Sequence, residues 1–267
     1  MLTTALITLT YIPYCKKNFL RYFCFHMKIQ ILQLLEGARS ARGVTVIIDV
    51  FRAFSTACYA FSKNADCIIP VADIEEAYRI RQANPDFLLM GERFEMKPPG
   101  FDYGNSPFQL PAEGLEGKTI VHTTSSGTQG IAAATHASEV LTGSFVNAGA
   151  IADYIKSIQP GTVSLVCMGY ACEYPTDEDT QCAIYIRNLL TGTSSNFEEM
   201  KEIIRTGSGR RFFEPEKQLW SPEADFHLCL QPDIFNFVLK AEHHPEYTVL
   251  KKIMIPEKQP QDEKVQL

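Results

Sequence analysis

The alternation of strand and helix patterns is the feature that most constrains the fold of this 267-residue chain. The clearest strand pattern is the run Val44-Thr-Val-Ile-Ile, in which β-branched residues follow one another without polar alternation. Such a run is typical of a strand that is buried on both faces of a sheet. Apolar or alternating runs predict strands within residues 28–33, 43–53, 66–71, 86–93, 117–125, 138–145 and 161–170.

Segments with helical spacing separate or follow these strands. The pattern predicts helices within residues 52–64, 73–84, 127–137, 147–159, 176–192, 196–208 and 232–242. Asp73 is a suitable N-cap for the second of them. Strands that alternate with helices favour a three-layer α/β/α fold, in which a largely parallel or mixed sheet lies between two layers of helices. In such sheets the ligand binds beyond the carboxyl ends of the strands, where candidate site residues are sought.

Charge and cysteine content narrow the classes of partner. The formal net charge of −6 argues against binding of nucleic acid, because sequence-independent binding depends on clustered Lys and Arg. The eight cysteines form no C-x-x-C pair, and several lie in apolar runs, where a thiol packs as a small hydrophobic group. We therefore expect reduced cysteines, no zinc site and a cytoplasmic protein.

The two ends of the chain differ from the part between them. Residues 1–14 are apolar but too few to span a bilayer, so we expect no membrane partner, with a cleaved signal or an anchor as alternatives. Met27 begins directly on a strand pattern, and residues 1–26 are interpreted as an extension outside the domain, with disorder left open. We assign residues 27–252 to one domain, compact or divided into two lobes, and residues 253–267 to a disordered tail.

Asp49 ends a buried strand, and Arg52 opens the next predicted helix. A carboxylate at this position suits a divalent cation or a substrate, and the helix N-terminus favours an anion. The alternative is that Asp49 only caps the helix and that Arg52 lies on the surface. Phe51 stands where the D-x-D motif of aspartyl-phosphate phosphatases has its second Asp, which argues against a covalent phosphoaspartate.

A hydroxyl-rich segment, His122-Thr-Thr-Ser-Ser-Gly-Thr-Gln-Gly, follows a predicted strand and precedes a predicted helix. Small hydroxyls and successive backbone N–H groups at such a turn suit a bound phosphate, although the segment lacks the Lys of a Walker A loop. The alternative is a helix cap with extra small residues. We predict a phosphate-binding loop that comprises Thr123, Thr124, Ser125, Ser126, Gly127 and Thr128.

Charged clusters follow two further predicted elements. Asp177, Glu178 and Asp179 suit Mg²⁺, which takes one or two carboxylates with waters and substrate oxygens, or they form an ordinary acidic first turn. The segment GSGRR at residues 207–211 suits a phosphate or sulfonate clamp, or a basic surface turn. The Pro- and Gly-rich residues 93–109 predict a long loop of the kind that often carries function.

Five motifs, taken in order, resemble those of the 2-phosphosulfolactate phosphatases, the ComB-like family. The motifs are VIIDVFRAFSTA, GERFEMKPPGFDYGNSP, TIVHTTSSGTQGI, VCMGY with DEDTQCA, and SGRRF. The resemblance runs from about Met27 to about Lys240. It implies an α/β fold, Mg²⁺ as cofactor and hydrolysis of a small anionic phosphomonoester. The reaction of the family converts 2-phosphosulfolactate to 3-sulfolactate and phosphate, which implies a place in coenzyme M biosynthesis.

The resemblance also implies roles for the residues at matching positions. The implied catalytic residues are Asp49, Arg52, Glu178 and Asp179. The implied metal ligands are Asp49, Glu178 and Asp179. The implied substrate-binding residues are Arg93, Asn105, Ser106, Thr123, Thr124, Ser125, Ser126, Gly127, Thr128 and Arg210. Ser126 stands where the family often has Asn, a change that keeps a small polar group but bears on substrate preference.

The sequence leaves three functions open. The first is a Mg²⁺-dependent phosphatase acting on 2-phosphosulfolactate, and the second is a phosphatase of a different small phospho-acid. The third is a non-catalytic protein that binds small anions, which the acids at Asp49 and at Glu178 and Asp179 disfavour. The oligomeric state is also open, with a homodimer as one alternative.

Overall fold

The computed structural model describes residues 27–256, so the predictions for residues 1–26 and 257–267 lie outside the described residues. The strands are β1 (Lys28–Gln33), β2 (Gly43–Ile48), β3 (Cys67–Pro70), β4 (Leu88–Gly91), β5 (Thr119–Thr123), β6 (Ala137–Gly143), β7 (Thr162–Cys167), β8 (Phe237–His243) and β9 (Thr248–Met254). The helices are α1 (Leu34–Ser40), α2 (Ala53–Ser62), α3 (Ile74–Ala83), α4 (Gly127–Ala133), α5 (Ala148–Ile158), α6 (Asp177–Thr191), α7 (Phe197–Thr206) and α8 (Glu223–Cys229). Short 3₁₀ helices are η1 (Phe145–Asn147), η2 (Ser208–Phe213) and η3 (Pro215–Lys217).

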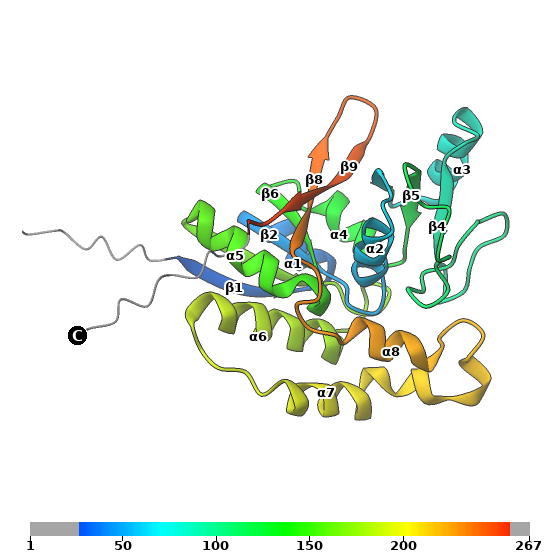
Figure 1. The fold of residues 1–267 in the computed structure, drawn as a ribbon. Coiled ribbons are helices and arrows are strands. Elements are labelled where there is room, and N and C mark those ends of the chain that lie inside the picture. The colour runs from blue at the N-terminus through cyan, green and yellow to red at the C-terminus, as the bar shows by residue number, and fades with distance from the viewer. Residues whose placement is uncertain (1–26, 257–267) are drawn as a thin grey trace, which may run out of the picture.

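These strands form one mixed sheet in the order β1-β7-β2-β6-β8-β9-β3-β5-β4 (Figure 1). Two groups of parallel strands, β1-β7-β2-β6 and β3-β5-β4, are separated by the antiparallel hairpin β8–β9. The hairpin pairs with β6 on one side and with β3 on the other, where Ile68 lies opposite Leu250. The predicted three-layer α/β fold with a parallel or mixed sheet is therefore confirmed.

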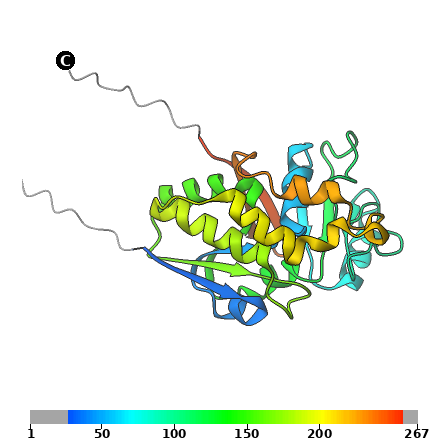
Figure 2. The same cartoon turned by 90° about the horizontal axis from the view of Figure 1, so that it is seen from below.

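Helices cover both faces of the sheet. Ile47 packs in a core cluster with residues of α1, α2 and α4, whereas Ile48 packs in a cluster with residues of α5 and α6. Neighbouring residues of β2 thus contact different helix layers, which explains why this strand is apolar throughout. Figure 2 shows α6 and α7 side by side over the second face. None of the helices in residues 27–256 has the length and apolar character that crossing a membrane requires.

The predicted helix at residues 232–242 is wrong, because Phe237–His243 form the strand β8. Phe237, Val238 and Leu239 are all buried, in clusters on the two sides of the sheet. A short run that is apolar on both sides has no period that separates a buried strand from a helix. The pattern also did not predict α1, α8 or β9, and β9 includes Ile253 and Met254, which the sequence assigned to the tail.

The β8–β9 hairpin reverses the polarity of the sheet. Because three successive pairings from β6 through β8 and β9 to β3 are antiparallel, the strands β3, β5 and β4 run opposite to β6 and β2 in the hydrogen-bonded order. In a flat sheet the carboxyl ends of the two parallel groups would lie at opposite edges. Neighbouring strands twist by roughly 20–25°, however, and this twist accumulates across the sheet. The segments after β2, β4 and β5 meet in the contacts described next.

Candidate active site

Asp49 lies directly after β2 and connects this strand to the first residues of two helices. Its Oδ1 accepts a hydrogen bond from the Ala53 N–H of α2 at 3.1 Å, and its Oδ2 accepts one from the Gly127 N–H of α4 at 2.8 Å. Gly127 has no room for a side chain, since a Cβ would lie 2.9 Å from Asp49 Oδ2 and 2.9 Å from Phe54 Cζ. The Asp49 carboxylate is therefore held in one orientation where it lines a cavity.

The hydroxyl-rich loop after β5 binds acidic side chains of the protein itself. The Ser125 N–H donates to Glu92 Oε1 at 2.7 Å, and the Ser125 hydroxyl donates to Glu92 Oε2 at 3.2 Å. Ser125 and Ser126 line the same cavity as Asp49. The other hydroxyl residues of the loop are buried and do not line the cavity: Thr123, Thr124 and Thr128. Two residues of the predicted phosphate-binding loop thus face the cavity, and two of its amides donate to carboxylates.

The cavity has a volume of about 70 Å³, which is room for roughly five to seven water-sized groups. A phosphoryl group has a similar size. Its walls come from the segments that follow β2, β4, β5 and β7, together with η2. The lining residues are Asp49, Phe51, Arg52, Glu92, Phe94, Glu95, Asn105, Ser125, Ser126, Gly169, Tyr170, Ala171, Thr176, Glu178 and Arg211.

Carboxylates outnumber cations in the wall of this cavity. The charged lining residues are Asp49, Glu92, Glu95, Glu178, Arg52 and Arg211. Burial raises the pKa of the Asp49 carboxyl to about 7, and the charges of Glu92 and Glu178 add to this effect against the opposing backbone N–H groups. Burial also raises the pKa of Glu178, against the opposing charge of Arg211. Carboxyl groups that are costly to ionise in this way would be stabilised in their charged form by a bound cation.

Asp179 lies beside this cavity but not in its wall. Its Oδ1 accepts the Val50 N–H at 2.8 Å and its Oδ2 accepts the Gly169 N–H at 2.9 Å, so the side chain connects the ends of β2 and β7. Burial, together with the charges of Glu178 and Asp49, raises its pKa well above the ordinary value. Of the three predicted metal ligands, Asp49 and Glu178 therefore share the cavity, and both Asp179 oxygens bind backbone amides.

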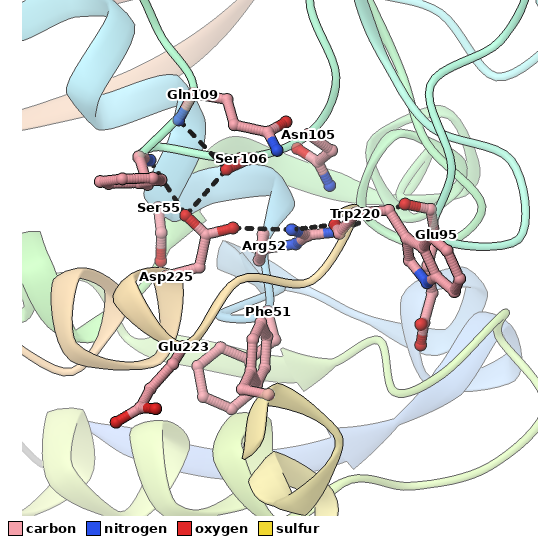
Figure 3. A network of polar contacts seen from close by, with 12 residues as sticks. Phe51, Arg52, Ser55, Glu95, Asn105, Ser106, Gln109, Trp220, Glu223 and Asp225 are labelled. Carbon is pink, nitrogen blue, oxygen red and sulfur yellow. Dashed lines mark hydrogen bonds and ion pairs between the residues drawn. The ribbon is translucent and has the colours of Figure 1, made fainter. Parts of the chain in front are cut away.

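Arg52 is buried in the cavity wall and is paired with a residue of α8. Its Nη1 donates to Asp225 Oδ2 and to the Trp220 carbonyl, both at 2.7 Å (Figure 3). Asp225 Oδ1 accepts the Ser106 hydroxyl and the Phe108 N–H, both at 2.9 Å. The buried carboxylate of Asp225 thus fixes the guanidinium at the cavity without lining the cavity itself. The sequence does not distinguish Asp225 from any acidic residue in the first turn of a helix.

The remaining predicted substrate-binding residues divide between the cavity wall and its supports. Asn105 lines the cavity, and Ser106 supports Asp225. Arg93 donates to the carbonyls of Glu92 and Ala72 and to the Thr123 hydroxyl, and it does not line the cavity. Its guanidinium therefore connects loops after β3, β4 and β5, and the structure does not bring it to the predicted substrate position.

Arg211, and not the predicted Arg210, belongs to the cavity. Arg210 is exposed. The Arg211 Nε lies 3.4 Å from Glu95 Oε1, and its guanidinium packs over the rings of Phe51 and Phe212. Within residues 27–256 this Nε has no hydrogen-bond partner of good geometry. The neighbouring residues of the GSGRR segment could not be separated by pattern, because the direction of each side chain depends on how η2 packs.

Replacing Arg211 with Ala is expected to weaken the binding of inorganic phosphate by roughly 10- to 100-fold, the range for hydrogen bonds to charged groups. The matched variant Arg210→Ala removes the same charge from an exposed side chain and should change the affinity by less than about twofold, because exposed charges are screened. Isothermal titration calorimetry measures both dissociation constants. Equal losses in the two variants would contradict the placement of Arg211.

The donor set of the cavity suits Mg²⁺ better than a metal held by protein alone. Asp49 and Glu178 share the cavity, and Glu92 is a third carboxylate in the same wall. Over residues 27–256 no group of three or more His, Cys, Asp or Glu side chains is arranged to hold an ion by itself. Mg²⁺ does not need such a group, because it keeps several waters and takes one or two carboxylates with substrate oxygens.

Comparison with known proteins places the chain among one set of relatives. It matches the family described as 2-phosphosulpholactate phosphatase over residues 29–244. A protein of Caldicellulosiruptor saccharolyticus is 41% identical over 54% of this chain and 61% of its own length. A protein of Caldanaerobacter subterraneus is 38% identical over 74% of this chain and 87% of its own length. A protein of Bacillus subtilis is 28% identical over 86% of this chain and 100% of its own length.

These three relatives carry the name probable 2-phosphosulfolactate phosphatase. The family match covers all the strands from β2 to β7 and all the helices, and it therefore includes every residue that lines the cavity. The resemblance of the five motifs is confirmed by this match. The chain belongs to the 2-phosphosulpholactate phosphatase family.

Proposed function

We propose that this protein is a phosphatase that hydrolyses a small phosphomonoester, with 2-phosphosulfolactate as substrate and 3-sulfolactate and phosphate as products. The main support is the meeting of Asp49, Glu178 and Arg52 in one phosphoryl-sized cavity. The relatives' printed name agrees with this substrate. We further propose that the enzyme depends on Mg²⁺, acts in the cytoplasm and supplies a step of coenzyme M biosynthesis. A homodimer stays a prediction.

The cations of the cavity would bind the phosphoryl group. Arg52 is held rigidly by Asp225, so its guanidinium requires little reorganisation when negative charge increases on the phosphoryl oxygens. Arg211 would bind a second oxygen, and Ser126, whose hydroxyl oxygen accepts from the Cys172 N–H, supplies a hydroxyl proton in the same wall. Phosphoryl transfer requires mainly positioning and charge stabilisation, which this set of donors can provide.

The carboxylates would hold Mg²⁺ and prepare the attacking water. Asp49 and Glu178 are the ligands that we assign, since both line the cavity and burial raises the pKa of each. When bound, Mg²⁺ neutralises phosphoryl oxygens and lowers the pKa of a water. A dianionic phosphomonoester is otherwise repelled by a wall in which carboxylates outnumber cations. Glu92 and Glu95 are the other carboxylates of the wall, and we assign Glu92 as the general base.

The test is phosphate release from 2-phosphosulfolactate and from 2-phospholactate, which lacks the sulfonate, in Mg²⁺ and in EDTA. We expect the higher kcat/KM with the sulfonated substrate, loss of activity in EDTA and recovery on addition of Mg²⁺. A preference for 2-phospholactate would assign the protein to a different small phospho-acid. Phosphate binding without any hydrolysis would overturn the enzymatic function in favour of a small-anion-binding protein.

Thermal stability should depend on pH through Asp49. The pKa of Asp49 is about 7 in the folded protein against 3.8 for the ordinary group, so between these values the folded state binds the proton and the unfolded state releases it. The stabilisation is complete below pH 3.8 and is lost as the pH rises through about 7. In EDTA, the melting temperature of the wild type should therefore fall relative to that of Asp49→Asn over this range.

Mg²⁺ is expected to reverse this loss at pH 8, because a ligand that binds only the folded state stabilises it. Addition of Mg²⁺ should raise the melting temperature of the wild type and leave that of Asp49→Asn unchanged. Differential scanning fluorimetry across the pH range gives both curves. A constant difference between wild type and variant at all pH values would contradict the raised pKa of Asp49.

A further inference from the structure

His122 is fully buried at the end of β5 and contacts a residue of the cavity wall. Its Nε2 lies 3.3 Å from Asn105 Oδ1, and this is the hydrogen bond that the Asn105 side chain makes within residues 27–256. Asn105 lines the catalytic cavity on one side and a second, more open groove beside Trp220 on the other. Packing alone therefore does not decide which end of the carboxamide faces the cavity. The hydrogen bond to His122 decides this orientation.

The protonation of His122 determines the direction of that bond. Burial, with the nearby charge of Arg93, lowers the pKa of His122 to about 3, so the imidazole is neutral near pH 7. Its Nδ1 is buried without a hydrogen-bond partner among the described residues. A neutral imidazole carries one N–H, and a buried N–H without a partner is rarer than a buried acceptor without one. The proton therefore belongs on Nε2, which donates to Asn105 Oδ1.

With Oδ1 accepting from His122, the NH₂ group of Asn105 is left for the cavity. Figure 3 shows this amide nitrogen on the side of the Arg52 guanidinium. The reverse orientation would present the Asn105 carbonyl oxygen to the cavity. Ionised phosphoryl oxygens only accept hydrogen bonds, so this carbonyl oxygen would repel them. The orientation of one amide thus decides whether this wall attracts or repels the substrate.

We propose that His122 is a positioning residue that holds the Asn105 carboxamide with its NH₂ group toward the cavity, where this group donates to a phosphoryl oxygen. The inference rests on the proposed function, since it assumes that the phosphoryl group binds in this cavity. Asn105 touches the substrate, and His122 acts only through Asn105. The donor adds to those of Arg52 and Arg211.

The test compares the affinity for inorganic phosphate of the wild type, Asn105→Ala, His122→Leu and the double variant, with and without Mg²⁺. Each single variant is expected to lose roughly 10- to 100-fold in affinity, the range for a hydrogen bond to a charged group. His122→Leu should cause no further loss in the Asn105→Ala background, because contacting residues that act as one unit are not additive. His122→Gln, whose amide can also donate, should recover most of the affinity.

Val121→Ala is the matched control, since Val121 is a buried neighbour on β5 that packs with Ile69 and Leu89 and does not line the cavity. It should lower the melting temperature and leave phosphate affinity unchanged. If His122→Leu lowered the phosphate affinity equally in the wild-type and the Asn105→Ala backgrounds, the role of His122 would be structural and the inference would be overturned. The inference would also be overturned if Asn105→Ala bound phosphate as tightly as the wild type, or if the wild type bound no phosphate. Phosphate binding with the expected coupling but no hydrolysis would instead overturn only the proposed enzymatic function.

Discussion

Asp49→Asn is expected to reduce kcat for phosphate release by about 1,000-fold, the upper part of the range for loss of one group that stabilises charge in a transition state. The carboxylate lines the cavity and is held by the N–H groups of Ala53 and Gly127. Asn has nearly the same shape, but it carries no charge and would turn an NH₂ group toward one of these two donors. The loss should therefore affect metal binding and chemistry, with little change in the size of the cavity.

Asp66→Asn is the control for this variant, because Asp66 is exposed and does not line the cavity. It should keep wild-type activity and the wild-type response to Mg²⁺. Steady-state kinetics over a range of Mg²⁺ concentrations measure both variants. Full Mg²⁺-dependent activity in Asp49→Asn would show that the carboxylate has no role in the reaction, and the assignment would then be wrong.

Asp225→Asn is expected to destabilise the protein by about 3–5 kcal/mol, because removal of one partner leaves a buried charge without compensation. The side chains of Arg52 and Asp225 are only 4% and 0% exposed, and their atoms are 2.7 Å apart. For a domain of this size the melting temperature should fall by roughly 10 °C. Phosphatase activity should fall as well, since Arg52 would no longer be held in the cavity wall.

Glu214→Gln is the matched control, since it breaks an ion pair with Lys217 that is about one third exposed. Such pairs contribute roughly 0–1 kcal/mol, so its melting temperature should stay close to that of the wild type. The double variant Arg52→Gln with Asp225→Asn removes both charges and should recover stability without recovering activity. Recovery of activity in the double variant would contradict a role for the Arg52 charge at the cavity.

The candidate site was only partly predictable from the sequence. Asp49, Glu178 and Ser125 were identified because each follows a strand with a clear apolar pattern, and such positions lie near the ligand in an α/β sheet. Arg211 and Arg210 are adjacent and equally basic, so the pattern could not choose between them. Asp225 comes from a segment with no motif, and His122 lies inside a motif but was not selected as a site residue. The importance of each depends on which buried side chain it contacts.

The direction of the strands in the sheet was likewise only partly predictable from the sequence. Local patterns predicted the strands from β1 to β7, but the helix predicted at residues 232–242 concealed β8 and the hairpin that reverses the sheet. The expectation that all ligand-binding loops share one carboxyl edge was therefore too simple. The segments after β2 and β5 nevertheless meet, as the hydrogen bond between Asp49 and Gly127 shows.

The sequence by itself determined the fold class, the family and the segments that supply the site, because these depend on hydrophobic period and on motifs that lie within a few residues. Only the tertiary structure decided which side chains share the cavity. It directed Glu178 into the wall while the adjacent Asp179 binds backbone amides, and it brought Asp225 to Arg52 from the other end of the chain. Packing determines the direction of side chains and the contacts between distant segments, and local sequence patterns do not predict either.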